Sequence, residues 1–341
     1  MKKIIAMMVL VVMSATLMIG CGTKETAAEK EPVTEKTSNE LTKVVISEFR
    51  NLSWLPVYVA YQNGYFQEEG LAPEFVLYKD GPIAFQGMHG GDSQFCLLSQ
   101  EPVLKAEQEG LDSSIIYSVL DTRLYGFVGA KDIKSVKDLK GQAIFAGMPG
   151  SAPYSFVSAI LKEGGLDPQK DVTFVNLDYS ASMTALSQGK IKASYINVDN
   201  RIEIQSMDVN MLVDTSNPAD AAKYLKADVF TGEIITTTGE FASKNPEVVQ
   251  DFVNAVHKGT KWINEHSAEE VAKLVAPLFQ GMEEDVLAKK ITILKGAITK
   301  TGYISEESQT AVENFAIKNG VINASIPYNQ IIDMQFVKTI K

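Results

Sequence analysis

Polar side chains stand where two of the predicted strands end. Ser99 and Gln100 follow one apolar run (SQFCLL), and Asn197 and Asp199 stand at and just beyond the end of another (ASYIN). Loops at the carboxyl ends of parallel strands face a common crevice, so these hydroxyl, amide and carboxylate groups can orient the polar atoms of a small ligand. Ordinary surface-turn chemistry is the alternative for Asn197 and Asp199.

An aromatic candidate follows the first predicted strand. Trp54 stands at the corner between that strand and the next helix, and Asn51 precedes it in the same loop. An exposed indole at this position would stack on a flat ligand or cover an apolar one. Burial in the core is the alternative for Trp54, because tryptophan is usually well buried. Asn51 and Trp54 are both counted as candidate ligand-binding residues.

A glycine- and proline-containing turn (GMPGSAPY) precedes a predicted helix and ends at Tyr154. The free backbone N–H groups and the positive dipole end of such a helix bind carboxylate, sulfonate or phosphate groups. Ser151 is the residue expected to take part, although it can also serve as the N-cap of its own helix. Tyr154 either offers its ring or hydroxyl to the ligand or packs locally.

A cation and the few residues suited to covalent chemistry complete the candidates. Arg123 precedes the strand expected to cross between lobes and is the best-placed cation for an anionic ligand, unless it is simply an exposed loop arginine. The three histidines, His89, His257 and His266, do not lie at metal-ligand spacing, and Cys96 is in a buried-looking strand. We therefore expect no catalytic residues, no metal and no cofactor.

These candidates must be positioned by a repeated pattern of strands and helices. The pattern predicts a mostly parallel sheet covered by helices on both faces. Strands are expected at 43–49, 74–78, 93–98 and 114–119, with helices at 54–63, 81–89 and 101–109. The pattern starts again with strands at 125–130, 142–146, 172–176 and 193–197, helices at 152–163 and 180–188, and a β-rich run at 232–237.

The restart predicts an α/β protein of two lobes with a cleft between them. We assign residues 42–128 and 231–341 to the first lobe and 129–230 to the second, with two crossing strands forming a hinge. Beyond Asn245 the chain is expected to be helical and its tail to rejoin the first lobe. A cleft of this kind suits a small ligand.

The first 41 residues predict an exported protein. Lys2 and Lys3 precede an apolar run at 4–19 that is short for a membrane-spanning helix, which is typical of a signal peptide over residues 1–20. Gly20-Cys21 resembles the lipobox of bacterial lipoproteins, which implies lipidation of Cys21; an ordinary signal peptide with a chance cysteine is the alternative. Residues 21–41, poor in apolar side chains, are expected to form a flexible tether.

Composition narrows the possible partners. The 341-residue chain has a formal net charge of −10, and its lysines and arginines do not form long runs. Nucleic-acid binding is therefore not expected, because it needs clustered cations to neutralise phosphates. With Cys21 lipidated only Cys96 remains, so no internal disulfide is expected.

Several short segments together resemble one family of binding proteins. The family comprises the periplasmic substrate-binding proteins that serve ABC importers of sulfonates, taurine, nitrate and thiamine-type pyrimidines. The resemblance rests on PVYVA at 56–60, GYF at 64–66, EGL at 69–71, Glu101-Pro102, SVKDLKG at 135–141, Gly150-Ser151 and Asn245-Pro246-Glu247.

The resemblance implies a type II periplasmic-binding-protein fold and a function. We expect an extracytoplasmic monomer, anchored to the cell membrane, that delivers a small molecule to an ABC permease. The ligand is expected to be an aromatic nitrogen heterocycle, such as a pyrimidine or vitamin precursor, or a sulfonate- or nitrate-type anion. An enzyme of the same fold acting on a pyrimidine-type substrate is the alternative, and a surface receptor without a ligand is a third possibility.

Overall fold

The computed structural model describes residues 40–227 and 229–340. The predicted signal peptide, the lipidation of Cys21 and almost all of the predicted tether lie outside the described residues. In the described part of the chain, no helix combines the length and the apolar character needed to cross a membrane.

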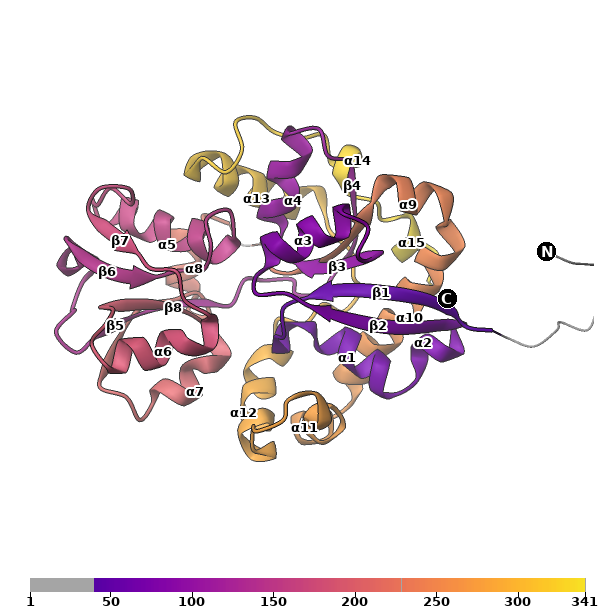
Figure 1. Ribbon diagram of the computed structural model, residues 1–341, viewed down its shortest axis with the longest axis horizontal. Coiled ribbons are helices and arrows are strands. Elements are labelled where there is room, and N and C mark those ends of the chain that lie inside the picture. The colour runs from indigo at the N-terminus through magenta and orange to yellow at the C-terminus, as the bar shows by residue number, and fades with distance from the viewer. Residues whose placement is uncertain (1–39, 228, 341) are drawn as a thin grey trace, which may run out of the picture. The chain divides into compact units, whose positions relative to one another are not determined.

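The first lobe is built on a five-stranded sheet with helices on both faces (Figure 1). Its strand order is β2-β1-β3-β10-β4; β1 runs parallel to β2 and β3, while β10 runs antiparallel to β3 and β4. The strands are β1 (Thr42–Glu48), β2 (Leu71–Leu77), β3 (Phe95–Leu98), β4 (Ser113–Ser118) and β10 (Ile234–Thr238).

Helices from both ends of the chain cover this sheet. The 20-residue α10 places Val249, Phe252, Val253 and Val256 on one buried face, and the Phe252 ring stacks on Phe95 of β3 with centroids 3.7 Å apart. The early helices are η1 (Leu52–Trp54), α1 (Leu55–Gln62), α2 (Tyr65–Glu68), α3 (Gly81–His89) and α4 (Gln100–Gln108). The later ones are α9 (Gly239–Lys244), α10 (Pro246–Glu265), α11 (Ala268–Val275), η4 (Ala276–Leu278), α12 (Glu284–Lys295), α13 (Glu306–Asn319), α14 (Tyr328–Ile331) and α15 (Gln335–Lys338).

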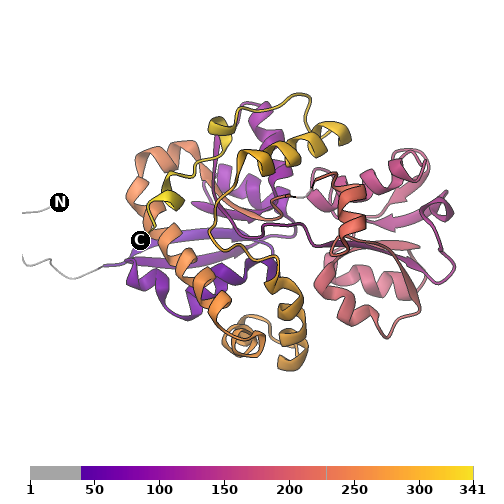
Figure 2. The ribbon, with the colours of Figure 1, turned by 180° about the vertical axis from the view of Figure 1, so that it is seen from behind.

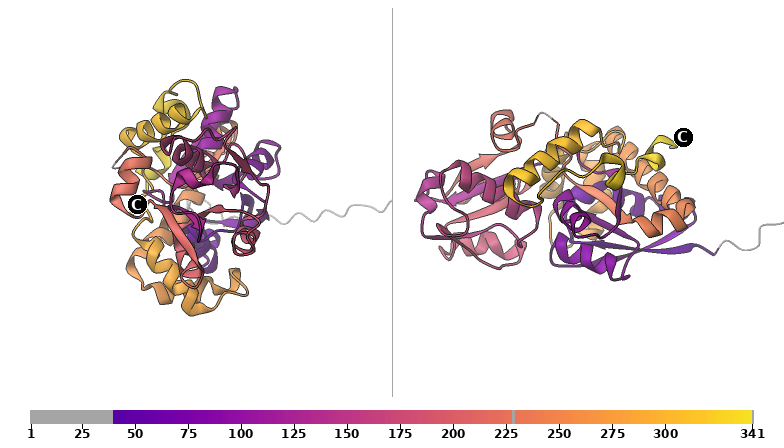
Figure 3. Two further views of the ribbon diagram at one scale, coloured as in Figure 1. Left: turned by 90° about the vertical axis from the view of Figure 1, so that its left-hand side faces the viewer. Right: turned by 90° about the horizontal axis from the view of Figure 1, so that it is seen from above.

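The second lobe repeats this plan in the order β7-β6-β8-β5-β9. Helices again lie on both faces of the sheet (Figure 3). Its strands are β5 (Tyr125–Ala130), β6 (Gln142–Phe145), β7 (Val172–Phe174), β8 (Ala193–Asn197) and β9 (Val209–Asp214). Its helices are η2 (Val136–Leu139), α5 (Ala152–Glu163), α6 (Tyr179–Ser187), η3 (Val198–Asn200), α7 (Arg201–Ile204) and α8 (Pro218–Tyr224).

The expected α/β architecture is confirmed, with differences at the edges. The predicted bounds of β5, β8, α3 and α5 match the structure residue for residue. The sequence did not predict β9 or α8, because an edge strand of mixed polarity and a short polar helix carry a weak periodic signal. In each lobe one strand, β10 or β5, runs antiparallel, so the sheets are mixed.

Two chain segments connect the lobes, as Figure 2 shows from behind. All of β5 pairs within the second sheet, so we propose crossings at 119–124 and 229–233 in place of a boundary at residue 128. The crossings run side by side, with the Gly232 N–H donating to the Leu120 carbonyl at 2.8 Å. A Cβ on Gly232 would stand 2.3 Å from the Thr122 carbonyl oxygen, so the close approach requires glycine.

Arg123, in the first crossing, is completely buried. Its guanidinium donates to both carboxylate oxygens of Glu101 on α4, at 2.5 and 3.0 Å. The rings of Tyr125, Phe230 and Phe315 lie around it, with centroids 5.0, 4.6 and 5.8 Å from the guanidinium carbon. The arginine expected to meet an anionic ligand is thus enclosed in an ion pair at the junction of the lobes.

We predict that Arg123→Met lowers the free energy of unfolding by about 3 to 5 kcal/mol, because it leaves the Glu101 carboxylate buried without its partner. The exposed pair Lys131–Asp208 offers a matched control, since Lys131→Met should cost less than about 1 kcal/mol. Urea unfolding of the two variants measures the difference. The double variant Arg123→Met/Glu101→Met should recover much of the loss. Equal stability of Arg123→Met and Lys131→Met would contradict the prediction.

Candidate functional site

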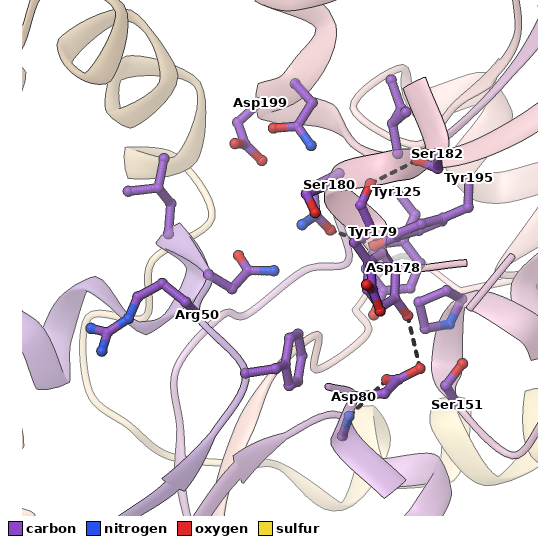
Figure 4. A pocket seen from close by; sticks show the side chains of 18 of the residues that line it. Arg50, Asp80, Tyr125, Ser151, Asp178, Tyr179, Ser180, Ser182, Tyr195 and Asp199 are labelled. Atoms are coloured by element: carbon purple, nitrogen blue, oxygen red, sulfur yellow. Dashed lines mark hydrogen bonds between the residues drawn. The ribbon is translucent and has the colours of Figure 1, made fainter. Parts of the chain in front are cut away.

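A pocket of about 680 Å³ is lined by residues of both lobes. The first lobe contributes the loop that ends β1, the start of α3, Ser99 and part of α12, while the second contributes the starts of α5 and α6 and the end of β8. These are segments at strand ends and helix starts, where an α/β fold exposes backbone and short polar side chains. Figure 4 shows the side chains converging from both sides.

Five of the predicted site residues line this pocket: Asn51, Ser99, Ser151, Asn197 and Asp199. Two of them also have local structural tasks. The Asn51 side-chain oxygen accepts from the Ser53 N–H at 2.9 Å, and the Ser151 hydroxyl accepts from the Tyr154 N–H at 3.3 Å, so both residues cap helices. The Tyr195 hydroxyl donates to the Asn197 side-chain oxygen.

The other four predicted residues do not line the pocket: Trp54, Gln100, Arg123 and Tyr154. Trp54 is completely buried, and its indole N–H donates to the Phe49 carbonyl at 2.9 Å, so it supports the pocket wall from behind. Tyr154 packs on Phe174, with ring centroids 4.5 Å apart. The Gln100 side chain is buried at the start of α4. For Trp54 and Tyr154 the structure thus has the packed positions that were the alternatives, whereas Gln100 was expected in a loop at the cleft.

The sequence reasoning missed Asp80, which bridges the lobes. Its carboxylate accepts from the Gly81 N–H at 2.7 Å, from the Met148 N–H of the second lobe at 3.0 Å and from the Tyr179 hydroxyl at 3.3 Å. Burial raises the pKa of Asp80 although these hydrogen bonds oppose the shift. The sequence feature that could have identified Asp80 is the Asp-Gly-Pro segment after a predicted strand, because Ser99 was selected for the same kind of position.

Glu233, also missed, stands at the end of the second crossing and is 5% exposed. One of its oxygens, Oε1, accepts from the Tyr125 hydroxyl at 2.9 Å. Burial raises the pKa of Glu233 to about 8, opposed by the charge of Arg123 and by the Tyr125 hydrogen bond. Glu233 carried no signal in the sequence, because its place depends on the side-by-side course of two segments about a hundred residues apart.

Ion pairs at the pocket rim join the lobes. Lys79 lies 3.0 Å from Asp178, and Lys290 of α12 lies 2.7 Å from Glu203 and 3.6 Å from Asp199. The carboxylates of Asp178 and Glu203 are about half exposed or more. The Lys79–Asp178 pair is exposed and contributes little free energy, so it can break and form again at low cost. The Lys290 side chain, in contrast, is buried, and only its partner Glu203 is about half exposed.

The pocket lacks the groups that covalent catalysis usually needs. Of the described residues, none of the histidines and no cysteine lines it. Complete burial raises the pKa of the Cys96 thiol, so this group is not available as a thiolate nucleophile. The aromatic rings, carboxylates and hydroxyls that line the pocket can hold a small molecule by stacking and hydrogen bonds.

Comparisons with known proteins give the same architecture. The chain is 25% identical over 330 residues to the riboflavin-binding protein RibY of Chloroflexus aurantiacus, covering 91% of this chain and 89% of RibY. It is 24% identical over 351 residues to a putative aliphatic sulfonates-binding protein of Bacillus subtilis, covering 99% and 96%. The alkanesulfonate-binding protein SsuA of Xanthomonas axonopodis superposes with a TM-score of 0.70 at 15% identity, covering 86% of this chain and 99% of SsuA, which shows a shared fold.

Some relatives are described as enzymes. Saccharomyces cerevisiae proteins described as 4-amino-5-hydroxymethyl-2-methylpyrimidine phosphate synthases match 61% of this chain at 25% identity. The family model described as NMT1/THI5-like matches residues 51–270, well over half of the chain. The two-lobed chain, with its pocket between two mixed sheets, therefore belongs to the NMT1/THI5-like family and has the periplasmic-binding-protein fold.

Proposed function

We propose that this protein captures a small molecule between its lobes and delivers it unchanged to an ABC importer. The observation that carries the proposal is the pocket of about 680 Å³, whose walls come from both lobes and whose rim carries ion pairs between the lobes. Relatives named as riboflavin- and sulfonate-binding proteins support it. The ligand is proposed to be an aromatic nitrogen heterocycle or a sulfonate- or nitrate-type anion.

Binding would work by closure about the two crossings. A ligand that contacts both lobes makes all of its contacts only in the closed form. It therefore lowers the free energy of that form and shifts the equilibrium toward it. Opening has to break the Lys79–Asp178 pair and the pairs of Lys290 with Asp199 and Glu203. It also has to break the hydrogen bonds that Asp80 accepts from Met148 and Tyr179. The open form can then receive or release the ligand.

An enzyme acting on a pyrimidine-type substrate is the second candidate function, favoured by the yeast relatives described as synthases. We propose the binding role over it because the described pocket residues include no histidine and no cysteine. To distinguish the binding function from the enzyme function, candidate pyrimidines are incubated with the protein and their masses are then measured by mass spectrometry. A mass change that depends on the protein would support the enzyme.

We further propose that the protein is an extracytoplasmic monomer held at the cell membrane through Cys21, with an ABC permease as its partner. The proposal rests on the apolar run at 4–19, the Gly20-Cys21 pair and the polar segment that follows. Two acyl chains on one cysteine give stable anchoring where a single chain is marginal.

Purified protein is expected to release a small molecule on denaturation and to be stabilised when that molecule is added back. A ligand at about 100 times its Kd adds about 2.7 kcal/mol to the free energy of unfolding, which a thermal melt detects. Native mass spectrometry of fresh protein identifies the cargo, and small-angle X-ray scattering should show compaction on binding. Absence of cargo, stabilisation and compaction across a broad nutrient panel would contradict the proposal.

Tyr179 should contribute to holding a flat ligand. Its ring lies nearly parallel to Phe49 of the first lobe, with centroids 6.4 Å apart and an angle of 19°. We predict that Tyr179→Ala weakens binding of an aromatic ligand by about 1 to 2 kcal/mol, measured by isothermal titration calorimetry. Tyr179→Phe, which keeps the ring and removes the hydrogen bond to Asp80, should keep most of the affinity; equal losses in both variants would argue against stacking.

We predict that Cys21→Ser releases the protein from the membrane, because no thiol remains to carry lipid. Fractionation of cells expressing each form measures the change, and ligand binding by the soluble form should equal that of the wild type. Membrane retention of the serine variant would show that another segment provides the anchor.

A further inference from the structure

We infer that the pocket selects a flat, uncharged ligand whose N–H groups donate to the carboxylates of Glu233 and Asp199, and that it excludes sulfonates and nitrate. The inference rests on the proposed function and decides between its two ligand classes. It depends on four observations: two unpartnered buried oxygens, the pairing of every pocket cation, an internal carboxylate at the helix starts, and the aromatic walls.

The pocket contains two buried carboxylate oxygens without partners among the described residues. Glu233 uses Oε1 to accept from Tyr125, while its Oε2 has no hydrogen-bond partner. Asp199, on η3 of the opposite lobe, is 3% exposed; its Oδ2 faces Lys290, while its Oδ1 has no partner. A buried acceptor without a donor costs free energy that a ligand N–H would recover. An anionic ligand offers only acceptor oxygens, which the carboxylate forms of these two groups cannot bind.

Among the described residues, the cations that line the pocket are already engaged in ion pairs. Arg50 lies 3.0 Å from Glu48, and in Figure 4 its side chain extends away from Tyr125 and Tyr179. The other two pocket cations, Lys79 and Lys290, form the rim pairs described above. Five carboxylates line the pocket with these three cations: Asp80, Asp178, Asp199, Glu203 and Glu233. Even when Glu233 is protonated, the other four carboxylates outnumber the three cations, and this excess of negative charge opposes the entry of an anion.

Helix starts at the pocket would normally attract an anion, but here the chain supplies its own. Asp80 accepts the N–H of Gly81 at the start of α3 and the N–H of Met148 in the turn before α5. Proline in the first turn removes further donors, at Pro82 in α3 and Pro153 in α5. At the start of α3 and in the turn before α5, the place where a sulfonate would accept backbone hydrogen bonds is therefore occupied by the Asp80 carboxylate.

The shape of the pocket agrees with an aromatic ligand. Tyr125 and Tyr195 meet nearly at right angles with centroids 5.0 Å apart, so the wall presents both an edge and a face. A volume of about 680 Å³ is far larger than nitrate needs. Six aromatic side chains line the pocket: Phe49, Tyr78, Tyr125, Tyr179, Tyr195 and Phe279.

The two ligand classes predict opposite effects of pH. With its pKa near 8, Glu233 is mostly protonated in the free protein at neutral pH. An N–H donor favours the carboxylate form, so binding releases a proton and becomes tighter as the pH rises toward 8; an anion favours the protonated form and binds more weakly. The groups that act on Glu233 are Tyr125, Tyr179 and Tyr195 of the second lobe, Arg123 of the crossing, and Glu101 and Asp80 of the first lobe.

Calorimetric titration of the mature protein with riboflavin, uracil, ethanesulfonate and nitrate tests the inference. We expect a neutral N–H compound to bind at least about tenfold more tightly than either anion, and its Kd to fall about threefold to tenfold between about pH 6 and pH 8. Glu233→Gln should weaken this binding about tenfold or more and remove the pH dependence. Glu74→Gln, an exposed carboxylate on β2 outside the pocket, should change neither.

The outcomes separate this inference from the proposed function. Tighter binding of ethanesulfonate or nitrate, or cargo that is anionic or lacks N–H groups, would overturn the inference and leave the import role standing. The inference would also be overturned if a neutral compound bound with an affinity that changed neither with pH nor with the Glu233→Gln substitution. No binding in the panel together with no cargo in native mass spectrometry would overturn both. If Glu233→Gln does not fold, the pH dependence of ligand binding by the wild-type protein tests the inference. A Kd that does not fall as the pH rises would then overturn it.

Discussion

The buried pair of Arg123 and Glu101 is the interaction on which the junction of the lobes depends. It joins α4 of the first lobe to the first crossing and places the guanidinium beside the ring of Tyr125. The Tyr125 hydroxyl in turn donates to Glu233, which stands on the second crossing and faces the pocket. The buried ion pair of Arg123 and Glu101 is costly to break, so it holds Tyr125 in place and, through the Tyr125 hydroxyl, fixes the position of Glu233 in the pocket.

Carboxylates that touch both lobes give the pocket its character. Asp80 belongs to the first lobe but takes hydrogen bonds from Met148 and Tyr179 of the second, and Asp199 and Glu203 of the second lobe face Lys290 of the first. These contacts are polar and specific, and they lie beside a hydrophobic cluster that includes residues of both lobes, such as Phe156 and Phe315. Polar contacts across a cleft suit a protein that must open and close, since water can replace each partner.

The same fold serves relatives named for chemically different ligands, so the ligand must be argued from the side chains. In this chain the pocket has buried acceptors without donors and cations with partners. Neither feature is visible in composition: the net charge of −10 describes the whole sequence and says nothing of a single pocket. Desolvation inside the pocket makes the small local excess of carboxylates important.

The sequence by itself determined the α/β class, the restart of the pattern at the second lobe, and many element bounds, such as those of α3 and α5. These follow from local periodicity and capping, which neighbouring residues decide. It also placed Ser99, Ser151 and Asp199 at the pocket, because strand ends face the cleft in this architecture. Only the tertiary structure decided that Trp54 and Arg123 are enclosed and that Asp80, Tyr179 and Glu233 line the pocket. Burial and pairing of these side chains depend on segments far apart in the chain, and no local pattern records which segments meet.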